Sequence, residues 1–346
     1  MRILSVSLLA AMSFAVSLAA APKPKNVILF IGDGMGAAHF TAARFIRGEN
    51  FKIGTMPVIG LSATSSADRA VTDSAAAATA LATGVKTNYT MVGVAPDGTP
   101  RRTVLEAAEA NSRATGLVTT SQLYDASPAA FAAHSTSRYR HPEIIRQMLA
   151  SGAELIAGGG AERFGRDDVP PLAESAVTNG YDLETTLDGM RTSAAAKVLA
   201  VFPDEPRERD FRDARLPDLT RVAIERLSSD ADGFFLMVEH EGTDTGSHTN
   251  DGAVVRDSLT SLDEAVGAAL DFAARDGNTL VVVTGDHETG GLRISEFSSH
   301  KFRMEWSTTD HTAAAVPVFA FGPGAEAFGG FHENSEIGGM LLETQE

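Results

Sequence analysis

Six short apolar runs, rich in β-branched residues, constrain the fold of this chain more than any other feature. They occupy residues 26–31, 115–120, 153–158, 233–239, 278–284 and 316–321. Because these runs lack polar alternation, they are typical of parallel strands that are covered on both faces. Helical patterns lie between them, at residues 102–111, 141–151, 217–228 and 253–275. This alternation predicts an α/β fold: a three-layer α/β/α sandwich with a mostly parallel central sheet.

Acidic residues stand at or just past the ends of several of these runs. Asp33 follows the first run, Glu239 ends the fourth and Asp286 follows the fifth, while Asp125 and Ser127 lie a few residues past the second. In open α/β sheets the ligand site lies beyond the carboxyl ends of the strands. Carboxylates gathered at one rim repel each other unless a positive charge lies among them. The pattern therefore indicates a cation site.

Asp33 lies in the segment IGDGMG, residues 31–36. Glycines after a strand are also typical of dinucleotide-binding turns, but here the spacing is G-x-G-x-G rather than G-x-G-x-x-G. Asp33 would also place a negative charge where a pyrophosphate binds. A metal ligand held close to a glycine-rich turn fits the segment better.

Three of the nine histidines have neighbours that suit metal binding. Asp244 and His248 are four residues apart, and so share one face if the segment is helical. His287 follows Asp286, and His311 lies shortly before the last apolar run. Aspartate and histidine without cysteine suit zinc, whereas a set with oxygens alone suits magnesium. We expect structural or surface roles for the other six: His39, His134, His141, His240, His300 and His332.

The segment VTDSAAAATALATG, residues 71–84, reads as an alanine-rich helix that begins at Asp73 and Ser74. Both residue types are favoured at helix N-caps, so capping alone explains the pair. Alternatively, Ser74 is a nucleophile at the positive end of the helix, where anions bind. The segment by itself leaves both interpretations open.

The first 20 residues resemble a secretory signal peptide, with Arg2, an apolar run at 3–16 and small residues before the cleavage point. A membrane anchor is the alternative, but the run is shorter than the roughly 20 residues of a span. We expect a secreted or periplasmic protein, free of the membrane after cleavage, with one catalytic domain at 21–346. The net charge of −16 argues against nucleic-acid binding. It does not exclude a small phosphate-bearing substrate, because bound cations can reverse the local charge.

Six blocks of the sequence resemble those of the alkaline phosphatase family, in the same order. They are IGDGMG, VTDSAAAAT, DASPAAFAAHSTSR, MVEHEGTDTGSH, TGDHETGG and DHTAAAVPVFAFGPG. Together they extend from about residue 25 to near the C-terminus. The resemblance implies the alkaline phosphatase fold with a small crown region. It also implies hydrolysis of phosphate monoesters through a phosphoserine.

The resemblance further implies two zinc ions, one magnesium ion and a role for each matching residue. Ser74 would be the nucleophile, and Arg138 would clamp the phosphate while Asp73 orients it. The implied metal ligands are Asp33, Asp286 and His287 for the zinc ion that activates Ser74, Asp244, His248 and His311 for the zinc ion on the leaving-group side, and Asp33, Ser127 and Glu239 for magnesium. Asp125 would contact a water on the magnesium ion. Metal activation of a serine and bidentate phosphate binding by arginine agree with these roles.

Three features depart from the family pattern. Ser127 stands where many relatives have threonine, and Thr245 where relatives often carry a larger residue, so phosphate affinity and third-site metal preference stay open. The segment between His287 and His311 is short, and in larger relatives this region contributes to a dimer interface. The sequence therefore leaves a homodimer and a monomer both open.

Two other functions compete with a monoesterase. A phosphodiesterase of the same superfamily would keep the two-zinc set, but Arg138 and Glu239 favour monoesters. A sulfatase or a phosphosugar mutase of the same superfamily is a further alternative, although the sequence motif of sulfatases differs from the one around Ser74. A secreted protein that binds metal or phosphate without turnover would not need Ser74. We expect small phosphate monoesters as the substrates.

Overall fold

A ten-stranded sheet forms the centre of the computed structural model, which describes residues 23–161, 172–205, 209–298 and 301–346. The strands lie in the order β14-β2-β13-β8-β1-β7-β3-β4-β6-β5. Their bounds are β1 (Asn26–Gly32), β2 (Val58–Ala63), β3 (Ala114–Gln122), β4 (Leu155–Gly159), β5 (Tyr181–Glu184), β6 (Lys197–Val201), β7 (Phe234–His240), β8 (Thr279–Gly285), β13 (Val316–Phe321) and β14 (Gly330–Glu333). The six predicted strands correspond to β1, β3, β4, β7, β8 and β13. The predicted signal peptide, and His300, lie outside the described residues.

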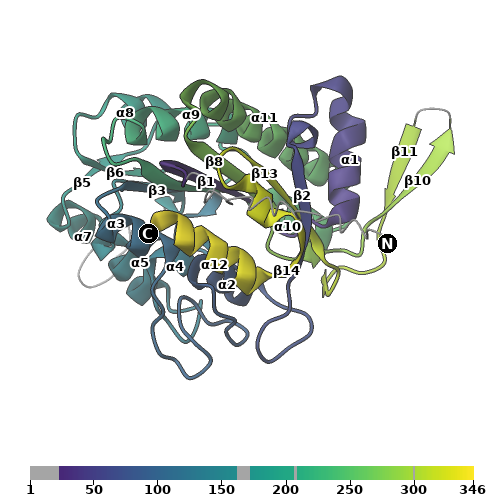
Figure 1. Ribbon diagram of the computed structural model, residues 1–346, viewed down its shortest axis with the longest axis horizontal. Helices are drawn as coiled ribbons and strands as arrows, with labels where there is room; N and C mark the ends of the chain where they lie inside the picture. The colour runs from purple at the N-terminus through teal and green to yellow at the C-terminus, as the bar shows by residue number, and fades with distance from the viewer. Residues whose placement is uncertain (1–22, 162–171, 206–208, 299–300) are drawn as a thin grey trace, which may run out of the picture.

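Helices cover both faces of the sheet and give the predicted three-layer sandwich. The helices are α1 (Ala37–Arg47), α2 (Ser74–Thr83), α3 (Val104–Ala110), α4 (Ala126–Ala132), α5 (His141–Ala150), α7 (Leu172–Thr178), α8 (Leu187–Thr192), α9 (Leu216–Leu227), α10 (Gly242–His248), α11 (Gly252–Asp276) and α12 (Asn334–Gln345), with short 3-10 turns at η1 (Gly48–Asn50), η2 (Ile53–Thr55) and η4 (Ala325–Phe328). One face packs against α2, α3, α4, α5, α7 and α12, and the other against α1, α8, α9 and α11. Figure 1 shows the first group below the sheet and the second above it.

Strand β1 illustrates why the apolar runs lack polar alternation. Val27, Leu29 and Ile31 pack into one core, whereas Ile28 and Phe30 pack into the other. Successive strand residues point to opposite faces, and here both faces are covered by helices. All five side chains are fully buried. The continuous apolar pattern is thus the consequence of the three-layer arrangement.

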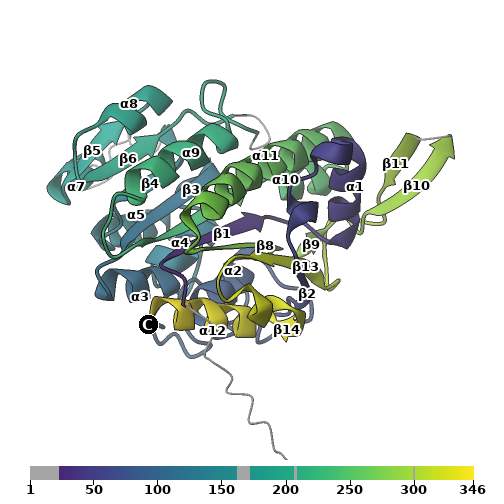
Figure 2. The same cartoon turned by 45° about the horizontal axis from the view of Figure 1, so that its top comes forward.

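The direction of β13 differs from the sequence-based prediction of a parallel strand. This strand pairs antiparallel with both β8 and β2, while the pairs among β1, β7, β8 and β3 are parallel. A parallel partner needs a long crossover, usually through a helix. Between β8 and β13 the described residues form no helix; they form β9 (Glu288–Thr289), β12 (His311–Thr312) and the hairpin of β10 (Arg293–Ser298) and β11 (Lys301–Glu305). The hairpin projects from the body in Figures 1 and 2. After the hairpin, β13 starts at the end of the sheet where β8 stops, and it therefore runs in the opposite direction.

Helix α2 is a buried helix whose N-terminus is fixed at the carboxyl edge of the sheet. All of its ten residues are buried, and small alanine side chains let α4 and α12 pack closely on it. Asp73 caps it by accepting a hydrogen bond from the Ala76 N–H at 3.2 Å. At the other end Gly84 has a φ of +69°, the left-handed conformation in which glycine commonly ends helices. The cap therefore sets the position of Ser74, the first helical residue.

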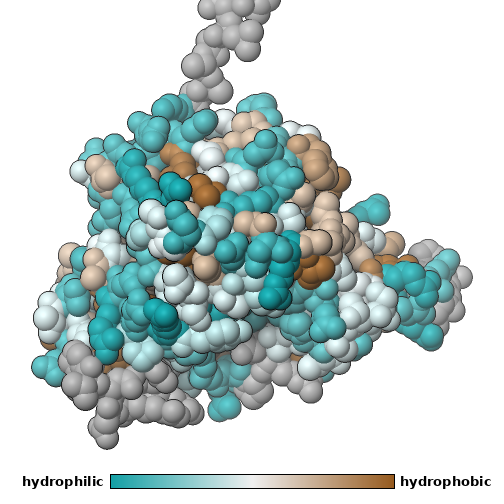
Figure 3. All heavy atoms as spheres, turned by 90° about the horizontal axis from the view of Figure 1, so that it is seen from below, coloured by the Kyte–Doolittle hydropathy of each residue, from teal (hydrophilic) through white to brown (hydrophobic). Residues whose placement is uncertain are grey.

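The described helices differ from membrane-spanning helices in length or in polarity. In the described part of the chain, each helix is too short or too polar to cross a membrane. Figure 3 views the molecule from below the orientation of Figure 1, and on this face strongly hydrophobic residues form small separate groups among hydrophilic ones.

Candidate active site

The carboxyl ends of β1, β7 and β8 place three acidic residues at one rim. The register aligns Gly32 with both His240 and Gly285, so the three strands end side by side. Asp33, Glu239 and Asp286 lie at these ends, and each is about 1% exposed. The convergence expected from the positions of these residues in the sequence is therefore present.

A first cluster surrounds the His287 ring. Its Nε2 lies 3.3 Å from Asp33 Oδ1, 3.3 Å from Asp286 Oδ2 and 3.3 Å from Ser74 Oγ. A neutral imidazole nitrogen can satisfy at most one of these three oxygens with a proton. Among the described residues, neither of the two carboxylate oxygens has a hydrogen-bond partner, and both are buried. One nitrogen and three oxygens that converge in this way suit a cation.

A second cluster joins Asp244, His248 and His311. The Nε2 atoms of the two histidines lie 3.2 Å apart, and Asp244 oxygens lie 3.2 Å from His248 and 3.5 Å from His311. The other ring nitrogens face backbone carbonyls, His248 Nδ1 that of Thr309 at 2.5 Å and His311 Nδ1 that of Thr72 at 2.9 Å. Carbonyls only accept hydrogen bonds, so both protons of the neutral rings belong on Nδ1. Two lone pairs and a carboxylate then face one another, as in a metal site.

The two clusters are in contact. The rings of His287 and His311 stack with centroids 3.7 Å apart and an interplanar angle of 21°. The Thr289 hydroxyl donates to Asp244 Oδ1 and lies 3.2 Å from His287 Nδ1, so it bridges the clusters. Thr289 was not predicted from the sequence, where its place two residues after His287 is the feature that marks it. The two clusters therefore form one continuous group of candidate metal ligands next to Ser74.

A third cluster contains oxygens alone. Asp33, Glu239 and Glu241 each place one carboxylate oxygen within 4.8 Å of the others. The buried Ser127 Oγ, predicted to belong here, has no hydrogen bond of regular geometry to any described residue. Thr119 donates to Glu239 Oε2 at 2.6 Å. The sequence analysis predicted Asp33, Glu239 and Ser127 for this site and missed Glu241.

Burial strongly perturbs the acidic groups. Desolvation, reinforced by neighbouring carboxylates, raises the pKa of Asp33 and of Asp286 well above the usual range. Desolvation raises the pKa of Glu239 to about 7 and lowers the pKa of His287. A buried acceptor without a partner costs about 1–3 kcal/mol. Divalent cations would offset the repulsion among the carboxylates and would give the unpartnered buried oxygens a ligand. The mixed nitrogen–oxygen sets fit zinc, and the oxygen-only set fits magnesium.

Arg138 lies between two carboxylates next to Ser74. Its Nη2 donates to Asp125 Oδ1 at 2.8 Å, and its Nη1 lies 3.4 Å from Asp73 Oδ2. Burial opposes the charge of Arg138, but these carboxylates outweigh it and raise the pKa. Conversely, the arginine lowers the pKa of Asp125 against the effect of burial. Asp125 therefore contacts Arg138, Ser121 and the Ala126 N–H, and its predicted contact with a magnesium-bound water stays a prediction.

The comparison with known families decides the identity of this arrangement. The sequence model of alkaline phosphatases matches residues 24–303. The chain belongs to the alkaline phosphatase family. The predicted family, fold and type of enzyme are thereby confirmed.

Similar alkaline phosphatases cover nearly the whole chain. Alkaline phosphatase 4 of Bacillus subtilis is 30% identical over 92% of this chain and 88% of its own length. The structure of the alkaline phosphatase from the Antarctic bacterium TAB5 is 36% identical, with a TM-score of 0.87 over 94% of this chain and 99% of that one. A variant of the TAB5 enzyme has magnesium bound in its M3 site, with a TM-score of 0.86 and 35% identity over the same shares of both chains.

This alkaline phosphatase has a cavity of about 310 Å³ beside the second cluster. Its lining residues are Arg69, Val71, Thr72, Tyr89, His248, Asp310 and His311. The Arg69 guanidinium carbon lies 4.0 Å from the centre of the Tyr89 ring. The sequence analysis found neither Arg69 nor Tyr89, because nothing local distinguishes them from surface residues.

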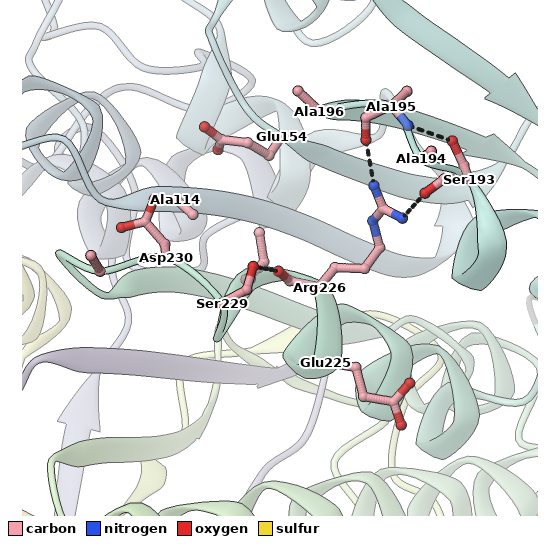
Figure 4. Close-up of a pocket in the computed structure, with 12 residues that line it drawn as sticks. Ala114, Glu154, Ser193, Ala194, Ala195, Ala196, Glu225, Arg226, Ser229 and Asp230 are labelled. Carbon is pink, nitrogen blue, oxygen red and sulfur yellow. Dashed lines mark hydrogen bonds between the residues drawn. The ribbon is translucent and has the colours of Figure 1, made fainter.

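A larger cavity, about 500 Å³, lies at the opposite edge of the sheet, where β3 and β7 begin. Figure 4 shows that Arg226 points to the backbone beside Ser193 and Ala195. Its guanidinium donates to the carbonyls of Met190, Ser193 and Ala195 at 2.8–3.2 Å. These donors are engaged by the protein backbone, so Arg226 holds the loop in place rather than a ligand.

Proposed function

We propose that this protein hydrolyses phosphate monoesters with Ser74 as the nucleophile. The observation that carries the proposal is the position of Ser74 Oγ. It is at the N-terminus of α2 and 3.3 Å from His287 Nε2, beside both nitrogen-containing clusters. The free N–H groups and the dipole at the start of this ten-residue helix attract a phosphoryl group.

Three metal ions complete the proposal. Asp33, Asp286 and His287 would hold one zinc ion, Asp244, His248 and His311 a second, and Asp33, Ser127 and Glu239 a magnesium ion. Bound cations lower the pKa of a coordinated hydroxyl and stabilise charge on the reacting oxygens. The donor atoms and the unpartnered buried oxygens described above support this assignment.

The protein residues have separate tasks in the reaction. Ser74 Oγ gives up its proton and forms a bond to phosphorus while the bond from phosphorus to the ester oxygen breaks, and the ester oxygen leaves as the alcohol with one proton gained. Water then breaks the Ser74–phosphorus bond, which restores the serine and releases inorganic phosphate. Arg138 binds two non-bridging phosphate oxygens with its planar fork, and Asp73 orients it. The cavity at Arg69 and Tyr89 gives the alcohol portion room.

Location and assembly follow as further parts of the proposal. Export by the N-terminal segment would deliver the protein to the periplasm or the medium. The net charge of −16 argues against nucleic acid as a partner and does not exclude small phosphate esters. Ile59, Leu61 and Phe331 are each more than 40% exposed on β2 and β14. This apolar edge supports a homodimer, which light scattering of the purified protein would test.

Replacement of Ser74 by alanine tests the mechanism. We expect turnover of p-nitrophenyl phosphate to fall at least about a thousandfold, because the phosphoserine can no longer form. Zinc content should stay the same. Ser228→Ala, at the end of α9, serves as the matched control and should keep full activity. Full turnover by Ser74→Ala would contradict the covalent mechanism.

A comparison of two substrates separates the competing functions. We expect p-nitrophenyl phosphate to be preferred over bis-p-nitrophenyl phosphate. The Arg138 clamp takes two non-bridging oxygens, which leaves a monoester a third one to face the cations and leaves a diester none. Preference for the diester would favour a phosphodiesterase. Binding of phosphate without turnover of either ester would favour the non-catalytic alternative.

A further inference from the structure

Glu241 lies at the junction of β7 and α10, where the backbone is held on both sides. Its N–H donates to Thr120 Oγ1 of β3 at 3.1 Å. Its carbonyl accepts from the Asp244 N–H at 3.0 Å, which starts α10. The residue is half-buried. The position of the Glu241 backbone is therefore set by a strand and a helix rather than by a mobile loop.

The Glu241 carboxylate joins a concentration of negative charge. One oxygen of Glu241 lies within 4.8 Å of oxygens of both Asp33 and Glu239. Three carboxylates at this separation disfavour each other's charged form unless a cation neutralises them.

Two buried oxygens at this place also lack a regular hydrogen bond, and one of them, on Asp33, is shared with the first cluster. Ser127 Oγ faces the Glu239 carboxylate and Asp33 Oδ1 lies 3.3 Å from His287 Nε2, but neither oxygen makes a hydrogen bond of regular geometry in the described part of the chain. Both residues are about 1% exposed. Buried polar atoms are otherwise almost always partnered. A cation with oxygen ligands would satisfy both atoms and neutralise the surrounding carboxylates.

We propose that Glu241 is a third carboxylate ligand of the cation held by Asp33, Glu239 and Ser127. The inference rests on the magnesium part of the proposed function and adds a residue that this part does not include. Hard divalent cations bind oxygen ligands, and the number of carboxylates tunes their affinity. Glu241 thereby strengthens magnesium binding at this site, whereas the two nitrogen-containing sites do not depend on it.

Calorimetric titration of the zinc-loaded enzyme with Mg²⁺ tests this role, with zinc content measured in parallel. We expect Glu241→Gln to raise the Kd for Mg²⁺ about tenfold or more, with zinc content unchanged. Glu239→Gln should abolish binding. Glu326→Gln is the matched control and should leave the Kd unchanged. It removes an equal charge from the exposed turn η4, which follows β13 at the edge of the sheet opposite the cation clusters.

Salt separates a ligand from a distant charge. At about 1 M KCl the screening length is about 3 Å, so a purely long-range effect of a half-exposed group disappears. We expect the difference between the wild type and Glu241→Gln to persist. If the difference disappears at high salt, the role of Glu241 is overturned and the magnesium site stays intact. The same holds if wild type and Glu241→Gln have an equal Kd while Glu239→Gln binds no Mg²⁺. If the wild type binds no Mg²⁺, the proposed magnesium site fails and the role of Glu241 fails with it.

Discussion

Asp73 combines two tasks that the sequence left as alternatives. One carboxylate oxygen accepts hydrogen bonds from the N–H groups of Ala76 and Thr90, at 3.2 and 3.1 Å, while the other lies 3.4 Å from Arg138. The cap that begins α2 therefore also fixes the arginine beside Ser74. Capping and catalysis are compatible because a carboxylate has two oxygens that face different directions.

The planar fork of Arg138 gives a prediction about phosphate binding. We expect Arg138→Ala to lower kcat/KM for p-nitrophenyl phosphate about 100-fold or more and to weaken inhibition by inorganic phosphate, because two charge-assisted hydrogen bonds are lost. Arg140→Ala is the matched control; Arg140 is more than half exposed and pairs with Glu143 at 3.6 Å. Unchanged phosphate inhibition in Arg138→Ala would contradict the clamp.

Helices α2 and α12 meet at a glycine. A Cβ at Gly338 would lie 2.1 Å from the carbonyl oxygen of Ala80, closer than any real Cβ contact. A Cβ at the neighbouring Gly339 would have no atom within 4 Å. Close helix packing at Gly338 is thus a condition for the placement of α2 and, through it, of Ser74.

These neighbouring glycines form a matched pair. We expect Gly338→Ala to lower the free energy of unfolding by about 1–3 kcal/mol, because the helices must move apart. Gly339→Ala should raise it by about 0.5–1 kcal/mol through the better helix propensity of alanine. Urea unfolding of the metal-loaded enzyme measures both. Equal effects of the two substitutions would show that the helix crossing tolerates a methyl group.

The whole site joins segments that are far apart in the sequence, and its carboxylates repel each other without cations. In the metal-free protein, burial raises the pKa of Glu239 to about 7. A raised pKa means that the folded state holds the proton more tightly than the unfolded chain. Its stabilising contribution is therefore complete below the ordinary glutamate pKa and is lost as the pH rises through about 7.

Chelation tests this consequence. We expect the metal-free enzyme to unfold at a lower temperature than the loaded enzyme, and to lose further stability between about pH 4.5 and 7. The metal-free Glu239→Gln variant should lose less stability over this pH interval, because glutamine does not titrate. Addition of zinc and magnesium should restore the unfolding temperature of the wild-type enzyme. The same pH dependence in both metal-free proteins would exclude Glu239 as its source.

The sequence alone determined the features that depend on local periodicity. Apolar runs identified the buried strands, the four-residue spacing placed Asp244 and His248 on one face of α10, and acidic residues at strand ends indicated a cation site. Strand β5, with four residues of which one is buried, gave too little pattern to be found.

Only the tertiary structure decided what depends on pairing between distant segments. The antiparallel direction of β13 follows from where the preceding hairpin returns, and its apolar side chains would suit either direction. Thr289, the carbonyl of Thr72 and Glu241 join their clusters because separate strands and turns end side by side. A local pattern specifies which way a side chain points relative to its own element, but only the packing of the elements specifies what it meets.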